Sequence, residues 1–70
     1  MAIRKTGVVR CFDGSKGYGY IDAENGEEVF VDYVALPAQG PALLSKGEQV
    51  TFSLVYTVRG PRAMDVARLN

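Results

Sequence analysis

The sequence predicts an all-β protein, a small barrel or sandwich of five short strands. Turn signals recur at short intervals along the chain, and the runs between them are either apolar or alternate between apolar and polar residues. The chain is 47% hydrophobic and 23% charged, which is typical of a globular protein. Its 70 residues are enough for one small domain, expected to span 1–70.

Three of the expected strands lie in the first half of the chain, over residues 3–12, 18–23 and 28–33. Asp13-Gly14-Ser15 separates the first two. Asn25-Gly26 is a strong hairpin signal, because both residue types tolerate the positive φ of tight turns. We therefore expect the second and third strands to be antiparallel neighbours.

The second half contains a long connection over residues 36–47 and two further strands over 49–58 and 62–69. Pro37, Gly40 and Pro41 lie in the connection, for which we expect at most one helical turn around residues 42–44. In the fourth strand the apolar set consists of Val50, Phe52, Leu54 and Tyr56. The dipeptide Gly60-Pro61 precedes the fifth strand.

The composition argues against several classes of function. Cys11 is the single cysteine and there is no histidine, so we expect no disulfide, no metal site, no cofactor and no enzymatic activity. The N-terminal MAIRKTG lacks the apolar core of a signal peptide, and no apolar run could span a membrane. We therefore expect a soluble, cytoplasmic protein.

Charge is segregated along the chain, although eight basic and eight acidic residues cancel. The charged residues among the first twenty are all basic apart from Asp13, and the next twelve residues include five acids and no base. Such blocks are most often solvated loops and strand ends, so they give little information on partners.

The aromatic residues carry the functional prediction. If Tyr18 and Tyr20 point outward from their strand, Ile21 points inward, and in the next strand Phe30 shares an outer face with Asp32. A single strand aromatic is usually a core residue, but this set predicts exposed rings next to cations, the surface on which single-stranded nucleic acids stack.

The glycines in this segment have two readings. Gly17 and Gly19 would leave the backbone low, so that a base could lie flat between the two rings. Gly19 also has a structural reading, at a bulge or barrel bend, and both roles can hold together.

These residues resemble the bacterial cold-shock proteins over most of the chain. Lys16-Gly-Tyr-Gly-Tyr-Ile21 is similar to that family's first ribonucleoprotein motif (KGFGFI), and Val29-Phe-Val-Asp-Tyr33 is similar to the second (VFVHF). Gly47 and Arg59-Gly60-Pro61 also match the family pattern. The resemblance implies a five-stranded antiparallel OB-type barrel that binds single-stranded RNA or DNA with little sequence preference, as an RNA chaperone or a regulator of transcription and translation.

The same resemblance implies roles for individual residues. Tyr18, Tyr20, Phe30 and Tyr33 would stack on bases, with Phe12 as a further ring at the edge. Arg10, Lys16 and Arg59 would face phosphates.

Three positions depart from the family pattern. Cys11 replaces a tryptophan, Asp32 a histidine and Pro41 a phenylalanine. We expect affinity below that of typical members, with a sharper salt dependence, and we expect Cys11→Trp and Asp32→His to raise it. Asp32 has a second reading as a base contact that accepts from an exocyclic amino group such as that of cytosine.

A rival function belongs to another class. Exposed tyrosines also suit protein interfaces, so the same face could mediate a protein–protein contact or dimerisation. The expected assembly is a monomer or a weak homodimer.

Overall fold

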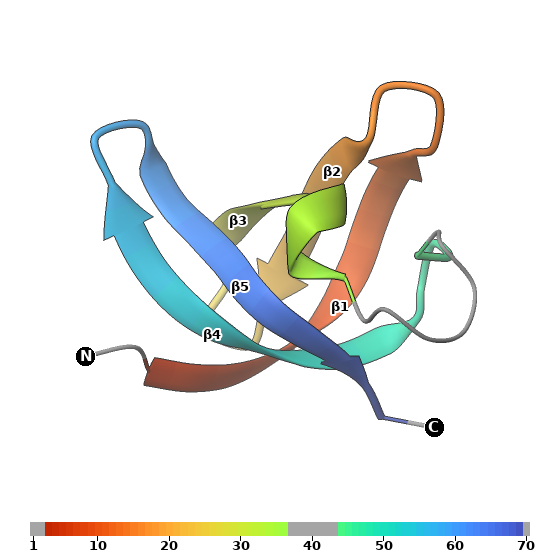
Figure 1. The fold of residues 1–70 in the computed structure, drawn as a ribbon. Helices are drawn as coiled ribbons and strands as arrows, with labels where there is room; N and C mark the ends of the chain where they lie inside the picture. Colours follow the sequence, from red (N-terminus) through yellow and green to blue (C-terminus); the bar gives the residue numbers. More distant parts are fainter. Residues whose placement is uncertain (1–2, 37–43, 70) are drawn as a thin grey trace.

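The computed structural model describes residues 3–36 and 44–69, which form a closed five-stranded barrel (Figure 1). The elements are β1 (Ile3–Asp13), β2 (Tyr18–Ala23), β3 (Glu28–Asp32), the 3-10 helix η1 (Tyr33–Ala35), β4 (Gln49–Thr57) and β5 (Gly60–Arg68). The all-β prediction is confirmed, with each of the five strands in its expected place. Among the described residues, no helix is long and apolar enough to cross a membrane.

The strands follow the order β1-β2-β3-β5-β4 around the barrel. All neighbouring pairs are antiparallel, as predicted, except one. β3 and β5 run parallel, with Phe30 facing Arg62. Local sequence patterns carry no signal for this pairing, because the two strands lie about half a chain apart.

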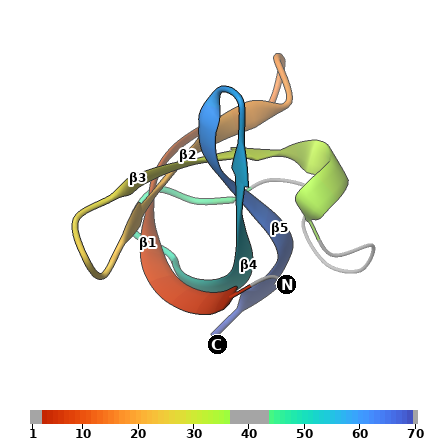
Figure 2. The same cartoon turned by 90° about the vertical axis from the view of Figure 1, so that its left-hand side faces the viewer.

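β1 is strongly curved and pairs with two other strands of the barrel. Its N-terminal half pairs with β4 and its C-terminal half with β2, and the register to β2 shifts between Val9 and Cys11. Arg10 is therefore the bulged residue. Figure 2 shows β1 curving round the barrel, which is the effect expected of a bulge.

The interior follows the predicted alternation. The buried apolar residues are Val9, Ile21, Ala23, Val29, Val31, Ala35, Leu44, Val50, Phe52, Leu54, Ala63 and Val66. Burying one of the larger of these side chains contributes roughly 1.5–3 kcal/mol. Ile21, Val29 and Val31 point inward as expected, so the opposite faces of β2 and β3 are turned outward.

Two aromatic positions depart from the strand pattern. Tyr56 belongs to the apolar set of β4 but is 66% exposed, and its hydroxyl donates to a carboxylate oxygen of Glu27 at 3.2 Å. β3 ends at Asp32, one residue earlier than predicted, so Tyr33 begins η1. The expected helical turn at residues 42–44 falls largely outside the described residues, although Leu44 is described as buried and non-helical.

Gly19 has a different role from the one suggested by its neighbouring rings. It is buried on the inner side of β2 opposite Phe12, so it does not lie between the outward rings. A β-carbon here would overlap the carbonyl oxygen of Cys11 and lie 2.6 Å from the Cα of Phe12. Gly19 thus has a structural role, because β1 approaches β2 too closely here for a side chain, whereas the bulge itself lies at Arg10 of β1.

Candidate nucleic-acid interface

The outer face of β2 and β3 carries three cross-strand pairs. The antiparallel register places Tyr18 opposite Asp32, Tyr20 opposite Phe30, and Asp22 opposite Glu28. Aromatic residues thus occupy the half of this face nearer the end of β3, and acids occupy both of its ends. The arrangement follows directly from the Asn25-Gly26 hairpin.

Tyr18, Tyr20 and Phe30 form a contiguous group that we call the ring cluster. The Tyr18 and Phe30 centroids are 5.7 Å apart with near-parallel planes, and Tyr20 meets Phe30 edge-on at 5.9 Å. Tyr18 is the most open, at 37% exposure, while Tyr20 and Phe30 are half-buried because the rings cover one another. The predicted outward orientation of all three rings is confirmed.

Asp32 lies at one end of the ring cluster, and each of its two carboxylate oxygens accepts one hydrogen bond. The Arg62 guanidinium donates to its Oδ2 at 2.7 Å, and the backbone N–H of Val34 donates to its Oδ1 at 3.2 Å, which caps η1. The Arg62 guanidinium carbon also lies 5.9 Å from the centre of the Phe30 ring, within cation–π range. Asp32 therefore does not present an unpaired charge; it neutralises a cation at the edge of the rings.

Arg10 is similarly paired at the other end of the face. Its Nε lies 3.1 Å from Asp22 Oδ1, and its Nη1 lies 2.6 Å from Glu28 Oε2. The hydrogen bond to Asp22, reinforced by the negative charges of both acids, raises the pKa of Arg10. The predicted phosphate-facing residue thus lies on the expected face, but two carboxylates already hold it.

Lys16 and Arg59 are the predicted cations that remain available. Both are exposed, and neither makes an ion pair within the part of the chain that the structure describes. Lys16 lies in the β1–β2 turn, which is ordered by Asp13. Arg59 lies in the β4–β5 hairpin, where its backbone N–H donates to Thr57 Oγ1 at 3.1 Å.

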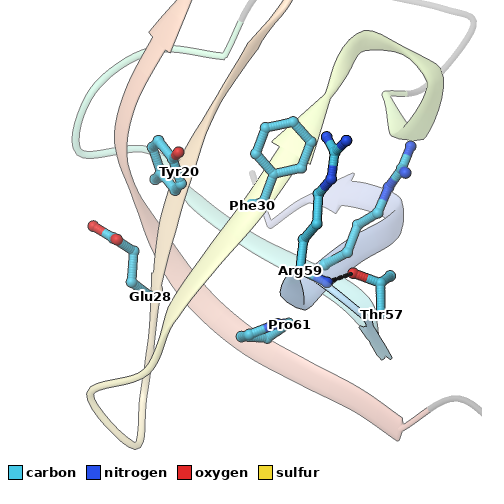
Figure 3. A pocket seen from close by; sticks show the side chains of 7 residues that line it. Tyr20, Glu28, Phe30, Thr57, Arg59 and Pro61 are labelled. Atoms are coloured by element: carbon cyan, nitrogen blue, oxygen red, sulfur yellow. Dashed lines mark hydrogen bonds between the residues drawn. The ribbon is translucent and has the colours of Figure 1, made fainter.

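Two hollows flank the ring cluster. A groove of about 450 Å³ runs between the rings and the β4–β5 hairpin, and Figure 3 shows the side chains of Tyr20, Phe30 and Arg59 around it. It is lined by Tyr20, Glu28, Phe30, Thr57, Arg59, Pro61 and Arg62. The second hollow, on the other side of Tyr20, is lined by Cys11, Phe12, Asp13, Gly14, Tyr18, Gly19 and Tyr20. The rings therefore form a ridge between two concave surfaces.

The remaining predicted rings lie apart from the cluster. Phe12 is half-buried and packs partly against the core, with its rim in the second hollow. Tyr33 is 68% exposed because η1 turns it away from β3, and its backbone N–H donates to the carbonyl of Gly17 at 2.9 Å. Cys11 is exposed. Pro41 lies outside the described residues.

Arg62, Thr57 and Pro61 were not among the predicted site residues. Arg62 is the most informative omission, because it contacts both Asp32 and Phe30. Only the parallel pairing of β3 with β5 brings it there, and no spacing in the sequence indicates that pairing. The described residues contain no group of three acidic, cysteine or histidine side chains that could hold a metal ion.

Comparison with known proteins gives matches along most of the chain. The family described as the 'cold-shock' DNA-binding domain matches residues 5–69. Cold shock-like protein CspD of Bacillus cereus is 42% identical over 64 residues, which cover 91% of this chain and 97% of that protein. Cold shock protein CspB of Bacillus caldolyticus is 41% identical, covering 90% and 96% respectively. Cold shock-like protein CspLB of Listeria monocytogenes is 40% identical, covering 93% and 98%.

Proposed function

This chain belongs to the cold-shock domain family of nucleic-acid-binding proteins, which are not enzymes, and we propose that it binds single-stranded RNA or DNA through the ring cluster. The proposed binding residues are those expected from the sequence, namely Arg10, Phe12, Lys16, Tyr18, Tyr20, Phe30, Asp32, Tyr33 and Arg59, with Arg62 added.

The observation that carries this proposal is the ridge of three outward rings between two hollows. The rings of Tyr18 and Tyr20 each lie within 6 Å of the Phe30 ring, centre to centre. Base stacking on such rings contributes roughly 1–3 kcal/mol per base and tolerates any sequence. Lys16 and Arg59, on turns at two sides of the ridge, are suited to hold the sugar-phosphate backbone.

The proposed mechanism needs no energy source. A protein that binds only unpaired strands shifts the equilibrium of a folded RNA toward its unpaired form by mass action. This is the basis for a role as an RNA chaperone of low sequence specificity.

Affinity below that of the family's usual members is part of the proposal. The sequence lacks a ring at Cys11, and the ion pairs to Asp32, Asp22 and Glu28 compete with phosphates for Arg62 and Arg10. The phosphates of a bound strand must either displace the acids from Arg62 and Arg10 or bind without contacts to these two cations.

The test is an anisotropy titration of a short fluorescein-labelled single-stranded oligonucleotide at low and moderate salt. Tyr18→Ala should weaken binding by about tenfold, through loss of one stacked base. Cys11→Trp should strengthen binding, because it adds a ring to the second hollow. Tyr56→Ala is the matched control, since Tyr56 is an exposed tyrosine outside the ring cluster.

Equal losses in Tyr18→Ala and Tyr56→Ala would place the ligand elsewhere. If the wild-type protein binds neither RNA nor DNA and shows a concentration-dependent dimer by light scattering, the rival role of this face in protein association is favoured instead.

A further inference from the structure

Asp32 and Arg62 place a hydrogen-bond acceptor and a set of donors side by side at the edge of the ring cluster. We propose that this pair makes the protein prefer bases that carry an exocyclic amino group, with cytosine favoured over uracil. The inference rests on the proposed function and adds base selection to it.

The first step concerns where a base edge would lie. Tyr18 is the most open ring of the cluster, and Asp32 is its direct cross-strand partner. Side chains in such positions have β-carbons about 4.5–5.5 Å apart, on the same face of the sheet. A base stacked on Tyr18 therefore brings one of its edges to the Asp32 carboxylate.

The second step concerns what that carboxylate can accept. Its two oxygens each receive one hydrogen bond, from Val34 and from Arg62. An ionised carboxylate has about four acceptor sites, so two stay open. The Asp32 side chain keeps 20% of its surface exposed, and that of Arg62 keeps 34%. Both members of the pair thus keep part of their surface open to solvent.

The third step compares the edges of the two pyrimidines. Cytosine has an amino donor at N4 beside acceptors at N3 and O2, so it can donate to Asp32 while it accepts from Arg62. Uracil carries a carbonyl oxygen at position 4 and a hydrogen on N3, so both groups are reversed relative to cytosine. In the same position its O4 would face a carboxylate oxygen of Asp32 and its N3–H would face the N–H groups of Arg62, and both contacts are repulsive.

The fourth step separates base selection from simple repulsion. Because Arg62 neutralises Asp32 at 2.7 Å, the pair has almost no net charge toward the phosphate backbone. What the pair still offers is a directional pattern of hydrogen-bonding groups, with acceptor sites on Asp32 and N–H donors beside them on Arg62. Such a pattern distinguishes one base from another, whereas a net charge would change the affinity for all strands equally.

The experiment compares two short labelled strands, oligo-dC and oligo-dU, which differ only in the donor and acceptor groups of their bases. At neutral pH and low salt, wild-type protein should bind oligo-dC at least about fivefold more tightly than oligo-dU. Asp32→Asn should reduce that ratio toward one. The asparagine keeps the shape and the capping oxygen, and its amide N–H groups can donate to uracil.

Asp22→Asn is the matched control. It removes the same charge from the same outer face, but at the end remote from Tyr18, where Asp22 pairs with Arg10. It should raise affinity for both strands alike and leave their ratio unchanged. Urea unfolding of each variant would verify that it is folded.

The outcomes distinguish the inference from the proposed function. Tight binding of both strands with no preference, or an equal change in both on Asp32→Asn, would overturn base selection while leaving nucleic-acid binding in place. Failure of wild-type protein to bind either strand would overturn both.

Discussion

Gly19 shows at the scale of one residue how a glycine next to functional rings can have a purely structural role. It lies between Tyr18 and Tyr20 in sequence, but its α-carbon faces the barrel interior, against the backbone of Cys11 and Phe12. The register between β1 and β2 shifts at Arg10, just before Phe12. The two rings thus lie on the outer face of the strand, and the glycine lies on its inner face.

Gly19→Ala should therefore destabilise the protein severely. The added methyl group would meet backbone atoms that cannot move without breaking the β1–β2 pairing, and we expect a loss of about 3 kcal/mol or more in the free energy of unfolding. Urea denaturation provides the measurement. Gly26→Ala is the control, because its β-carbon would meet nothing within 4 Å and only its φ of +87° is strained. Similar losses in the two variants would contradict the close-approach explanation.

Residue patterns predicted which side chains face outward, but not which charges meet. The inward Ile21 and outward Tyr18 follow from a period of two, a property of any strand. The partners of Arg10 and Asp32 depend on how neighbouring strands align, and for Arg62 on a parallel contact between distant segments. Long-range ion pairs of this kind leave no local trace in a sequence.

The β1–β2 turn is the element that presents Lys16 to the site, and Asp13 organises it. Asp13 Oδ1 accepts from the Ser15 hydroxyl at 2.7 Å, and from the backbone N–H groups of Ser15 and Lys16 at 3.0 and 3.2 Å. These bonds favour the ionised carboxylate. The hydroxyl bond is the largest of the effects that lower the pKa of Asp13 below its ordinary value.

A lowered pKa predicts a loss of stability in acid. Asp13 stabilises the folded state fully above its unfolded pKa of about 3.9, and this contribution is lost as the pH falls through its lower folded-state pKa. Asp13→Asn should have a free energy of unfolding that depends less on pH below pH ~4. Urea unfolding at a series of pH values measures this. Parallel pH profiles for wild type and variant would contradict it.

Element boundaries were predicted less well than element existence. The strand expected over 28–33 ends at Asp32, because that side chain caps η1 and redirects the chain. An aspartate at this position is compatible with either a strand residue or a cap, and only the backbone after it decides between them. Tyr33 is consequently exposed by the helical turn and not by strand alternation.

Across the whole molecule, ion pairing limits the charge available to a polyanion. Lys16 and Arg59 are unpaired among the described residues of the proposed site, whereas Arg10 and Arg62 are held by acids. The sequence alone suggested a sharp salt dependence. The salt dependence of binding arises from counterions that are released when cations of the protein contact phosphates. Because Arg10 and Arg62 are held by acids, fewer cations are available for such contacts, and the structure favours a shallow salt dependence.

We therefore expect log K to fall with log salt at a slope of about −1.4, the value for two phosphate contacts on a single strand. Titrations at several salt concentrations measure it. The double variant Asp22→Asn with Glu28→Gln frees Arg10 and should steepen the slope by about 0.7. A steep wild-type slope that the double variant leaves unchanged would show that the ion pairs open on binding.

The family and the barrel could be predicted from two motifs, five strand signals and one hairpin turn, because these are local features. Closure of the barrel could not be derived from them, and the resemblance supplied it. The groove beside Phe30 needed the structure, since it lies between β3 and the β4–β5 hairpin, which meet only after closure.

The facing of Phe30 and Arg62 across the parallel strands has one more consequence. The two residues that join β3 and β5, the one parallel pair in the described part of the chain, also shape the proposed recognition face. The same two residues therefore contribute to barrel closure and to ligand recognition. A substitution at either position would change the contact between β3 and β5 as well as the binding face. Variants designed to alter specificity must therefore be measured for both the free energy of unfolding and affinity.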